Sequence, residues 1–142
     1  MVLVQEFTMS AWRRTAIEKL PKYRQIIDHS KSVMDFLDEI NYDFTQAHRD
    51  PIDEDIIRGV YDFAWRAVGE SRNDDISNSV AIGFFEDLPQ DKRVRELLPR
   101  FMTRDQFLGM VDIFKYHLSP EEHSEFVRDF LKRRESFMRF SQ

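Results

Sequence analysis

Two histidines that flank a serine–proline corner form one candidate group whose residue types could do chemistry. His117 and His123 lie on either side of Ser119-Pro120, with two glutamates between them. Imidazole and carboxylate groups are common zinc ligands, so a metal ion that bridges two helix ends is one hypothesis. The alternative is structural, since a cation suits the last turn of a helix. We keep both histidines only as candidates and predict neither a metal nor a cofactor.

Two adjacent acids in the stretch SVAIGFFEDLPQ, residues 79–90, form a second candidate. Glu86 and Asp87 fall in the expected last turn of a helix, where the helix dipole costs a carboxylate roughly 0.3–1 kcal/mol. One interpretation is that the acids pair with the bases of the KRVR segment, residues 92–95. The other is that they face a groove and bind the basic group of a partner. Gly83, in the same helix, predicts the close approach of a neighbouring helix.

A tryptophan and two arginines form the third candidate group. Trp65 and Arg66 lie in the stretch DFAWRAVGESR, which Arg72 ends. Trp65 is expected to belong to the core, and the competing interpretation is a ring at the rim of a groove, since tryptophan and arginine are favoured at the centres of protein interfaces. The candidate binding residues are thus Trp65, Arg66, Arg72, Glu86 and Asp87, and no catalytic residue is predicted.

The signatures of common enzyme chemistries are absent from the sequence. It contains no His-Glu-x-x-His, no Glu-x-x-His, no glycine-rich nucleotide loop and no Gly-x-Ser-x-Gly. The sequence has no cysteine, which excludes disulfides, thiolate metal sites and cysteine nucleophiles.

Length and composition predict one globular domain with a packed interior. The chain has 142 residues, of which 42% are hydrophobic and 33% charged, and its thirteen phenylalanines need a core in which to be buried. The net charge is −5, which argues against a nucleic-acid binder unless the charges segregate. No signal peptide and no membrane-spanning segment is expected.

The charges do segregate along the chain. Residues 35–55 hold eight acids and a single arginine. Five bases lie near the C-terminus: Arg128, Lys132, Arg133, Arg134 and Arg139. The two regions could be solvated helix faces that attract each other within the fold, or the bases could form a patch for an anionic partner.

Helix signals run through the whole chain, whereas the sequence has no Asn-Gly or Asp-Gly hairpin. The longest expected helix runs from about Lys22 to His48, along a single apolar seam with steps of four and three residues. Asp50 is expected to cap the next helix, with Pro51 at its first position. The remaining helices are expected to start near Ser10, at Asn73 or Asp74, before Val94, and at the capping boxes of Thr103 and Ser119.

These signals predict an all-α fold, a single-domain bundle of about seven antiparallel helices joined by short loops. A curved stack of helix pairs stays open as the alternative arrangement. The domain is expected to span residues 1–142, with residues 1–9 as a flexible N-terminal segment. The helix that begins at Asp50 has apolar residues around most of its circumference, so it should be the central one.

Three segments together resemble a small bacterial all-helical family of unknown function. They are LPKYR, YDFAWRAV and NSVAIGFFEDLP, in that order, within residues 20–100. The resemblance implies a helical fold and a bacterial, cytoplasmic protein, and it carries no catalytic residues to this chain.

We therefore expect a non-enzymatic helical module that binds another protein or regulates it. One alternative is a helical protein with an interhelical pocket that binds or hydrolyses a small ligand. The other is nucleic-acid binding through the basic C-terminal helix. The expected partner is another protein rather than nucleic acid or a membrane, and association with a second copy of the chain stays open.

Overall fold

The computed structural model describes residues 9–69 and 74–140, which contain eight α-helices and no β-strand. The α-helices are α2 (Ala11–Lys19), α3 (Arg24–His29), α4 (Val33–Gln46), α5 (Glu54–Gly69), α6 (Asp74–Val80), α7 (Lys92–Phe101), α8 (Arg104–Met110) and α9 (Pro120–Phe140). Short turns of other helix types join them: η1 (Pro21–Tyr23), the π-helix η2 (Ala81–Phe85), η3 (Leu88–Gln90) and η4 (Phe114–His117). The all-α prediction is confirmed, whereas most of the expected flexible segment 1–9 lies outside the described residues.

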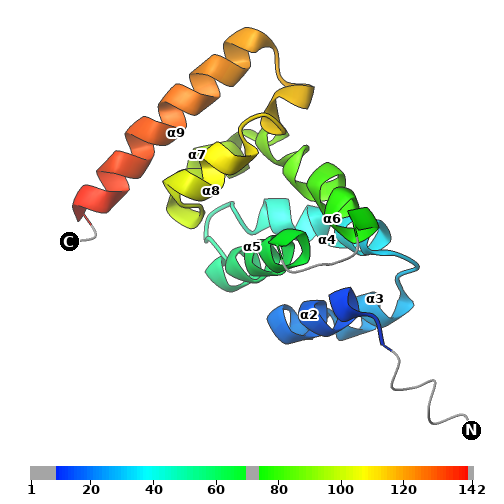
Figure 1. The fold of residues 1–142 in the computed structure, drawn as a ribbon. Coiled ribbons are helices and arrows are strands. Elements are labelled where there is room, and N and C mark those ends of the chain that lie inside the picture. Colours follow the sequence, from blue (N-terminus) through cyan, green and yellow to red (C-terminus); the bar gives the residue numbers. More distant parts are fainter. Residues whose placement is uncertain (1–8, 70–73, 141–142) are drawn as a thin grey trace, which may run out of the picture.

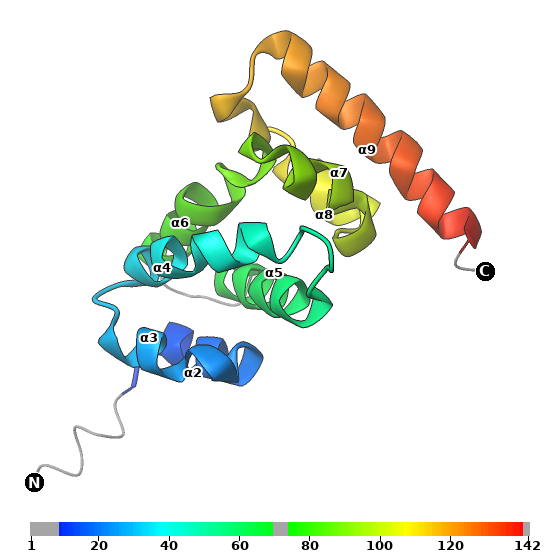
Figure 2. The ribbon, with the colours of Figure 1, turned by 180° about the vertical axis from the view of Figure 1, so that it is seen from behind.

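The helices are arranged in three successive tiers (Figure 1). α2 and α3 form one end, α4, α5 and α6 lie in the middle, and α7, α8 and α9 form the other end. Figure 2, seen from behind, shows the same order, with α9 along the outer side of the last tier. α5 is central as predicted, since it packs against α2, α4, α6 and α7 and eight of its sixteen residues are buried.

The prediction of one long helix over residues 22–48 is wrong, because the chain turns at Ser30. The backbone there is extended, with φ −73° and ψ 135°, and the Ser30 hydroxyl donates to the carbonyl of Ile26. Ser32 then starts a new helix, since its hydroxyl accepts from the backbone N–H of Asp35. The two serines of HSKS thus supply local hydrogen bonds that compete with a continuous helix.

The expected start of the next helix is also wrong. α5 begins at Glu54, and Asp53 supplies the N-terminal hydrogen bond, because its carboxylate accepts from the backbone N–H of Ile56. Asp50 and Pro51 lie in the preceding turn, where the peptide bond between them is cis. The segment is held by the backbone N–H of Asp53, which donates to the carbonyl of Ala47.

Both predicted capping boxes are confirmed. The Thr103 hydroxyl accepts from the N–H of Gln106, whose side chain accepts from the N–H of Thr103. Ser119 and Glu122 form the same reciprocal pair at the start of α9. α8 is short and ends at Met110, and its Leu108 side chain is 39% exposed.

Clusters of aromatic rings fill much of the core. In the middle tier, Phe84 contacts Phe44, Tyr61 and Phe85, with ring centroids 5.0–5.7 Å apart. A second cluster joins α8, η4 and α9 through Phe107, Phe114, Phe126 and Phe130. Within the described residues, no helix is both long and apolar enough to cross a membrane.

Gly59 of α5 lies directly against the end of α2. A Cβ at this position would lie 2.8 Å from the carbonyl oxygen of Lys19 and 2.7 Å from Cδ2 of Leu20. Gly109, in α8, has no atom within 4 Å of the equivalent position. The packing of the first tier on the central helix therefore requires that residue 59 has no side chain beyond Cα.

Gly59→Ala should lower the free energy of unfolding by about 1–3 kcal/mol, because the methyl group would push α2 away from α5. Gly109→Ala is the matched control and should raise it by about 0.5–1 kcal/mol, since alanine favours a helix and meets no neighbour. Urea unfolding followed by circular dichroism measures both. Two variants that shift the midpoint in the same direction would contradict this account.

His48 is a fully buried histidine at the end of α4. Its Nδ1–H donates to the carbonyl of Phe44 at 2.8 Å, whereas Nε2 has no hydrogen-bond partner among the described residues. The rings of Phe44 and Phe101 meet it edge-on. Burial lowers the pKa of His48 below its usual 6.5, and the bond to Phe44 only partly opposes this effect. The neutral imidazole is therefore the form that the core accommodates.

Acid should destabilise the protein through His48. Below about pH 6.5 the unfolded chain binds the proton more readily than the folded one, so stability falls until the pH reaches the lower folded pKa. The slope from this residue is at most about 1.4 kcal/mol per pH unit. His48→Asn, which retains a donor near Nδ1, should remove that slope in urea unfolding measured from pH 7.5 to 5. His29→Asn, at an exposed position, should leave it unchanged, and equal effects of the two variants would disprove the assignment.

Candidate functional site

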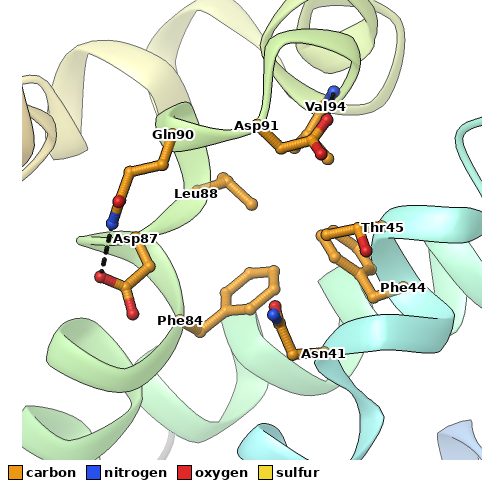
Figure 3. A pocket seen from close by; sticks show the side chains of 9 residues that line it. All are labelled: Asn41, Phe44, Thr45, Phe84, Asp87, Leu88, Gln90, Asp91 and Val94. Carbon is orange, nitrogen blue, oxygen red and sulfur yellow. Dashed lines mark hydrogen bonds between the residues drawn. The ribbon is translucent and has the colours of Figure 1, made fainter.

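A pocket lies between the C-terminal half of α4 and the segment that connects α6 to α7. Its volume is about 360 Å³. Nine residues line it: Asn41, Phe44, Thr45, Phe84, Asp87, Leu88, Gln90, Asp91 and Val94 (Figure 3). The four apolar side chains are buried, and the five others all carry a side-chain oxygen. The pocket thus combines an apolar floor with a rim of hydrogen-bond acceptors.

The π-helix η2 positions one side of this pocket. The N–H of Glu86 donates to the carbonyl of Ala81, five residues back, which closes the wider turn. The turn buries both Phe84, against Phe44, and Phe85, whose ring lies 4.6 Å from that of Trp65. It therefore places two adjacent aromatic rings in the core and delivers the acids that follow to the surface.

Gly83 lets this turn approach α4. A Cβ on Gly83 would lie 2.3 Å from the sulfur of Met34. The predicted close approach at Gly83 is therefore confirmed, and the neighbouring helix is α4. Single π-helical turns within α-helices are frequently found at functional sites.

Glu86 and Asp87 share a single partner, His117. Its Nε2 lies 3.0 Å from Oε1 of Glu86 and 3.0 Å from Oδ1 of Asp87. The expected local pairing with residues 92–95 is therefore wrong. The pairing partner comes from η4, thirty residues along the chain, because η4 packs against η3. The histidine thus gives both carboxylates a nearby partner at a helix end that disfavours them.

Asp87 reaches both this pair and the pocket. Its Oδ1 also accepts a hydrogen bond from Nε2 of Gln90 at 3.0 Å, whereas its Oδ2 has no hydrogen bond with the described residues. The Asp87 side chain is 56% exposed. Oδ1 of Asp87 is therefore held in place, and Oδ2 remains available to accept a hydrogen bond from a ligand.

Asp91 holds the opposite part of the rim in a fixed position. Its carboxylate accepts from the N–H of Val94 and caps α7, and it forms a two-point pair with Arg49 at 3.2 and 3.0 Å. Burial alone would raise the pKa of Asp91, but the bonds from Arg49 and Val94 outweigh burial and lower it. The negative charge of Asp91 is thus paired within the protein, with Arg49.

The sequence-predicted residues do not gather at one place. Trp65 and Arg66 lie on α5 outside the pocket, where Arg66 is 3.5 Å from Glu18 and the indole N–H of Trp65 is buried without a partner among the described residues. Arg72 lies outside the described residues. Of the five candidates, only Asp87 lines the pocket.

The two candidate metal ligands are likewise separate. His123 contacts the carbonyl of Val111 at 2.8 Å through Nε2, whereas His117 pairs with the acids. Within residues 9–69 and 74–140, no group of three or more histidine or acidic side chains is placed to hold a metal ion. The structure therefore gives each histidine a separate structural partner.

Two of the C-terminal bases have structural partners on α7. Arg133 donates to the carbonyl of Glu96 at 3.1 Å, and Arg134 donates to that of Pro99 at 3.0 Å. Pro99 lies inside α7 and has no N–H, so it cannot continue the helical hydrogen bonds. The arginines thus dock α9 onto the last turns of α7.

Sequence reasoning missed four polar residues of the pocket: Asn41, Thr45, Gln90 and Asp91. Asn41 and Thr45 lie four residues apart beside Phe44, on the flank of the apolar seam. That spacing was a usable signal, since it places both on one side of a helix. Nothing in the local sequence indicated that residues 84–94 would cover this flank.

No protein-family model, curated protein or solved structure matches this chain. The resemblance to a bacterial helical family therefore stays a prediction.

Asp91→Ala should lower the free energy of unfolding at pH 7 by about 1–2 kcal/mol, because α7 loses its cap and Arg49 its partner. Asp91→Asn should cost less, since an amide oxygen still accepts from Val94. The stabilising carboxylate is present above pH 3.8 and is lost as the pH falls through the lower folded pKa, a loss that the asparagine variant lacks. Urea unfolding at pH 7 and pH 3 tests both statements. Equal midpoints for the wild type and Asp91→Ala at pH 7 would contradict them.

Proposed function

We propose that this protein is a non-enzymatic binding module, and that the pocket between α4 and η3 is where it contacts another protein. The observation that carries the proposal is the mixed lining of the pocket. Buried aromatic and aliphatic side chains form its floor, and acceptors that are exposed or partly exposed form its rim. An apolar centre with a polar rim is the usual anatomy of a protein interface.

The rim supports a binding role rather than a catalytic one. Each of its two carboxylates is engaged by a neighbour, Asp87 by Gln90 and His117, and Asp91 by Arg49. The pocket is lined by no histidine, serine or lysine, which are common general bases and nucleophiles. The arrangement can fix a ligand by shape and hydrogen bonds.

The framework around the pocket is preorganised for such a role. Phe44 and Phe84 are packed on Tyr61 of α5, and Asp91 is held at the start of α7. A preformed site pays less conformational entropy on binding than a site that must first order its side chains.

Affinity capture from the native host tests the proposal. Asn41→Arg would place a long charged side chain at the pocket, so it should remove the captured partner. Gln46→Arg adds the same charge at an exposed position of α4 outside the pocket, so it should retain the partner. Circular dichroism should show both variants folded. A partner that both variants capture as well as the wild type would place binding elsewhere and refute the assignment.

A further inference from the structure

We propose that this pocket binds an arginine side chain of the partner protein. This inference rests on the proposed function and adds the chemistry of the contact. The alkyl part of the arginine would lie on the apolar floor, and its guanidinium group would reach Asp87 and the neighbouring acceptors. The argument follows from the hydrogen-bonding capacity that the rim leaves unused.

The rim presents acceptors whose capacity is not used within the protein. Asp87 Oδ2 has no hydrogen bond with the described residues, and the Asn41 side chain forms none with them either. The Thr45 hydroxyl donates to the carbonyl of Tyr42, which leaves its oxygen lone pairs available. The Gln90 side chain donates to Asp87 through nitrogen, so its oxygen remains free to accept. A ligand with several N–H donors satisfies all of these groups.

The charge of the site selects a cation. No lysine or arginine lines the pocket. Arg49 lies next to it, but both guanidinium nitrogens that contact Asp91 are used in that pair, which is thereby neutralised. Glu86 and Asp87 then leave two carboxylates against the single imidazole of His117. This excess of negative charge attracts a positively charged ligand and repels an anion.

The apolar floor of the pocket favours a planar cation over a compact one. Phe44 and Phe84 lie with ring centroids 5.2 Å apart, and Leu88 and Val94 complete the apolar surface. A guanidinium group is planar, stacks on aromatic rings and donates in a fork to a carboxylate and its neighbours. An ammonium ion is compact and more strongly hydrated, so it gains less at such a surface. An inorganic cation is not indicated, since no group of three metal-binding side chains occurs among the described residues.

His117 is the internal competitor of this ligand. Its Nε2 lies 3.0 Å from an oxygen of Asp87 and 3.0 Å from an oxygen of Glu86. Removing it frees Oε1 of Glu86 and one hydrogen-bonding position on Oδ1 of Asp87, so an incoming guanidinium finds more unoccupied carboxylate acceptors. Loss of His117 should therefore strengthen arginine binding, whereas loss of the Asp87 charge should weaken it.

Titration of the full chain with blocked tripeptides tests the proposal. Gly-Arg-Gly should shift the backbone amide signals of Thr45, Gln90 and Asp91 in two-dimensional NMR at pH 7.5. Gly-citrulline-Gly, which has the same shape without the charge, should bind at least tenfold more weakly, and Gly-Lys-Gly should also bind more weakly. Asp87→Asn should raise the Kd about tenfold or more, because a hydrogen bond between charged groups is lost. His117→Ala should lower the Kd about twofold to tenfold.

Asp38→Asn is the matched control, since Asp38 is an exposed acid of α4 that does not line the pocket. It should leave the Kd unchanged, which excludes a general effect of net charge. Dispersed NMR spectra establish that each variant is folded. Equal binding of the arginine and citrulline peptides, equal effects of Asp87→Asn and Asp38→Asn, or no binding by any peptide would overturn the arginine assignment. If Asn41→Arg still removes a captured partner in that case, the proposed function stands and only the chemistry of the contact is wrong.

Discussion

The contact between Phe44 of α4 and Phe84 of the π-helix is the constraint on which the rest of the middle tier depends. Both rings also contact Tyr61 of α5, so three elements meet at one aromatic cluster. Burying such rings contributes most of the stabilisation that a small domain can obtain. The same contact forms the floor of the pocket, which means that the core and the candidate site share side chains. A change at either ring would therefore alter stability and binding together.

The π-turn explains how one short segment serves two environments. A regular helix places consecutive residues about 100° apart, and the wider turn at residues 81–85 still buries both phenylalanines because Gly83 allows α4 to come close. The acids that follow emerge where η4 packs, and Nε2 of His117 lies 3.0 Å from an oxygen of each. The cost of carboxylates at a helix end is thus offset by a residue distant in sequence. The arrangement also leaves one oxygen of Asp87 without a hydrogen bond to any residue in the described part of the chain.

The helical fold class and several helix ends could be predicted from the sequence because they depend on local chemistry. The capping boxes at Thr103 and Ser119 involve residues three apart, so a short window contains all the information. The turn at Ser30 was missed because the apolar seam of residues 26–47 continues across it. Seam residues remain buried whether or not the helix is continuous, so periodicity did not reveal the break.

The site was less predictable, because its contacts join distant segments. The sequence makes His117 a metal candidate and offers the two acids either nearby bases or a partner's basic group, but no local pattern pairs positions thirty residues apart. The sequence indicates Asp87 because a carboxylate in the last turn of a helix is unfavourable, and such exceptions to local rules often mark functional sites. Gln90 breaks no rule and gives no signal, and the helical spacing of Asn41 and Thr45 places them on one side of α4 without indicating what covers that side. Their role follows only from the tertiary approach of α4 to η3.

The docking of α9 through Arg133 and Arg134 has a consequence for how the basic C-terminus is studied. Both guanidinium groups bond to main-chain carbonyls near a proline that interrupts the bonding of α7. Neutralising these arginines to look for nucleic-acid contacts would therefore loosen the outer helix as well. A drop in affinity after such a change would report misplacement of α9 and could not be interpreted as the loss of phosphate contacts. Arg128 and Lys132, for which no bond to α7 is seen, are the cleaner positions at which to vary the charge of this helix.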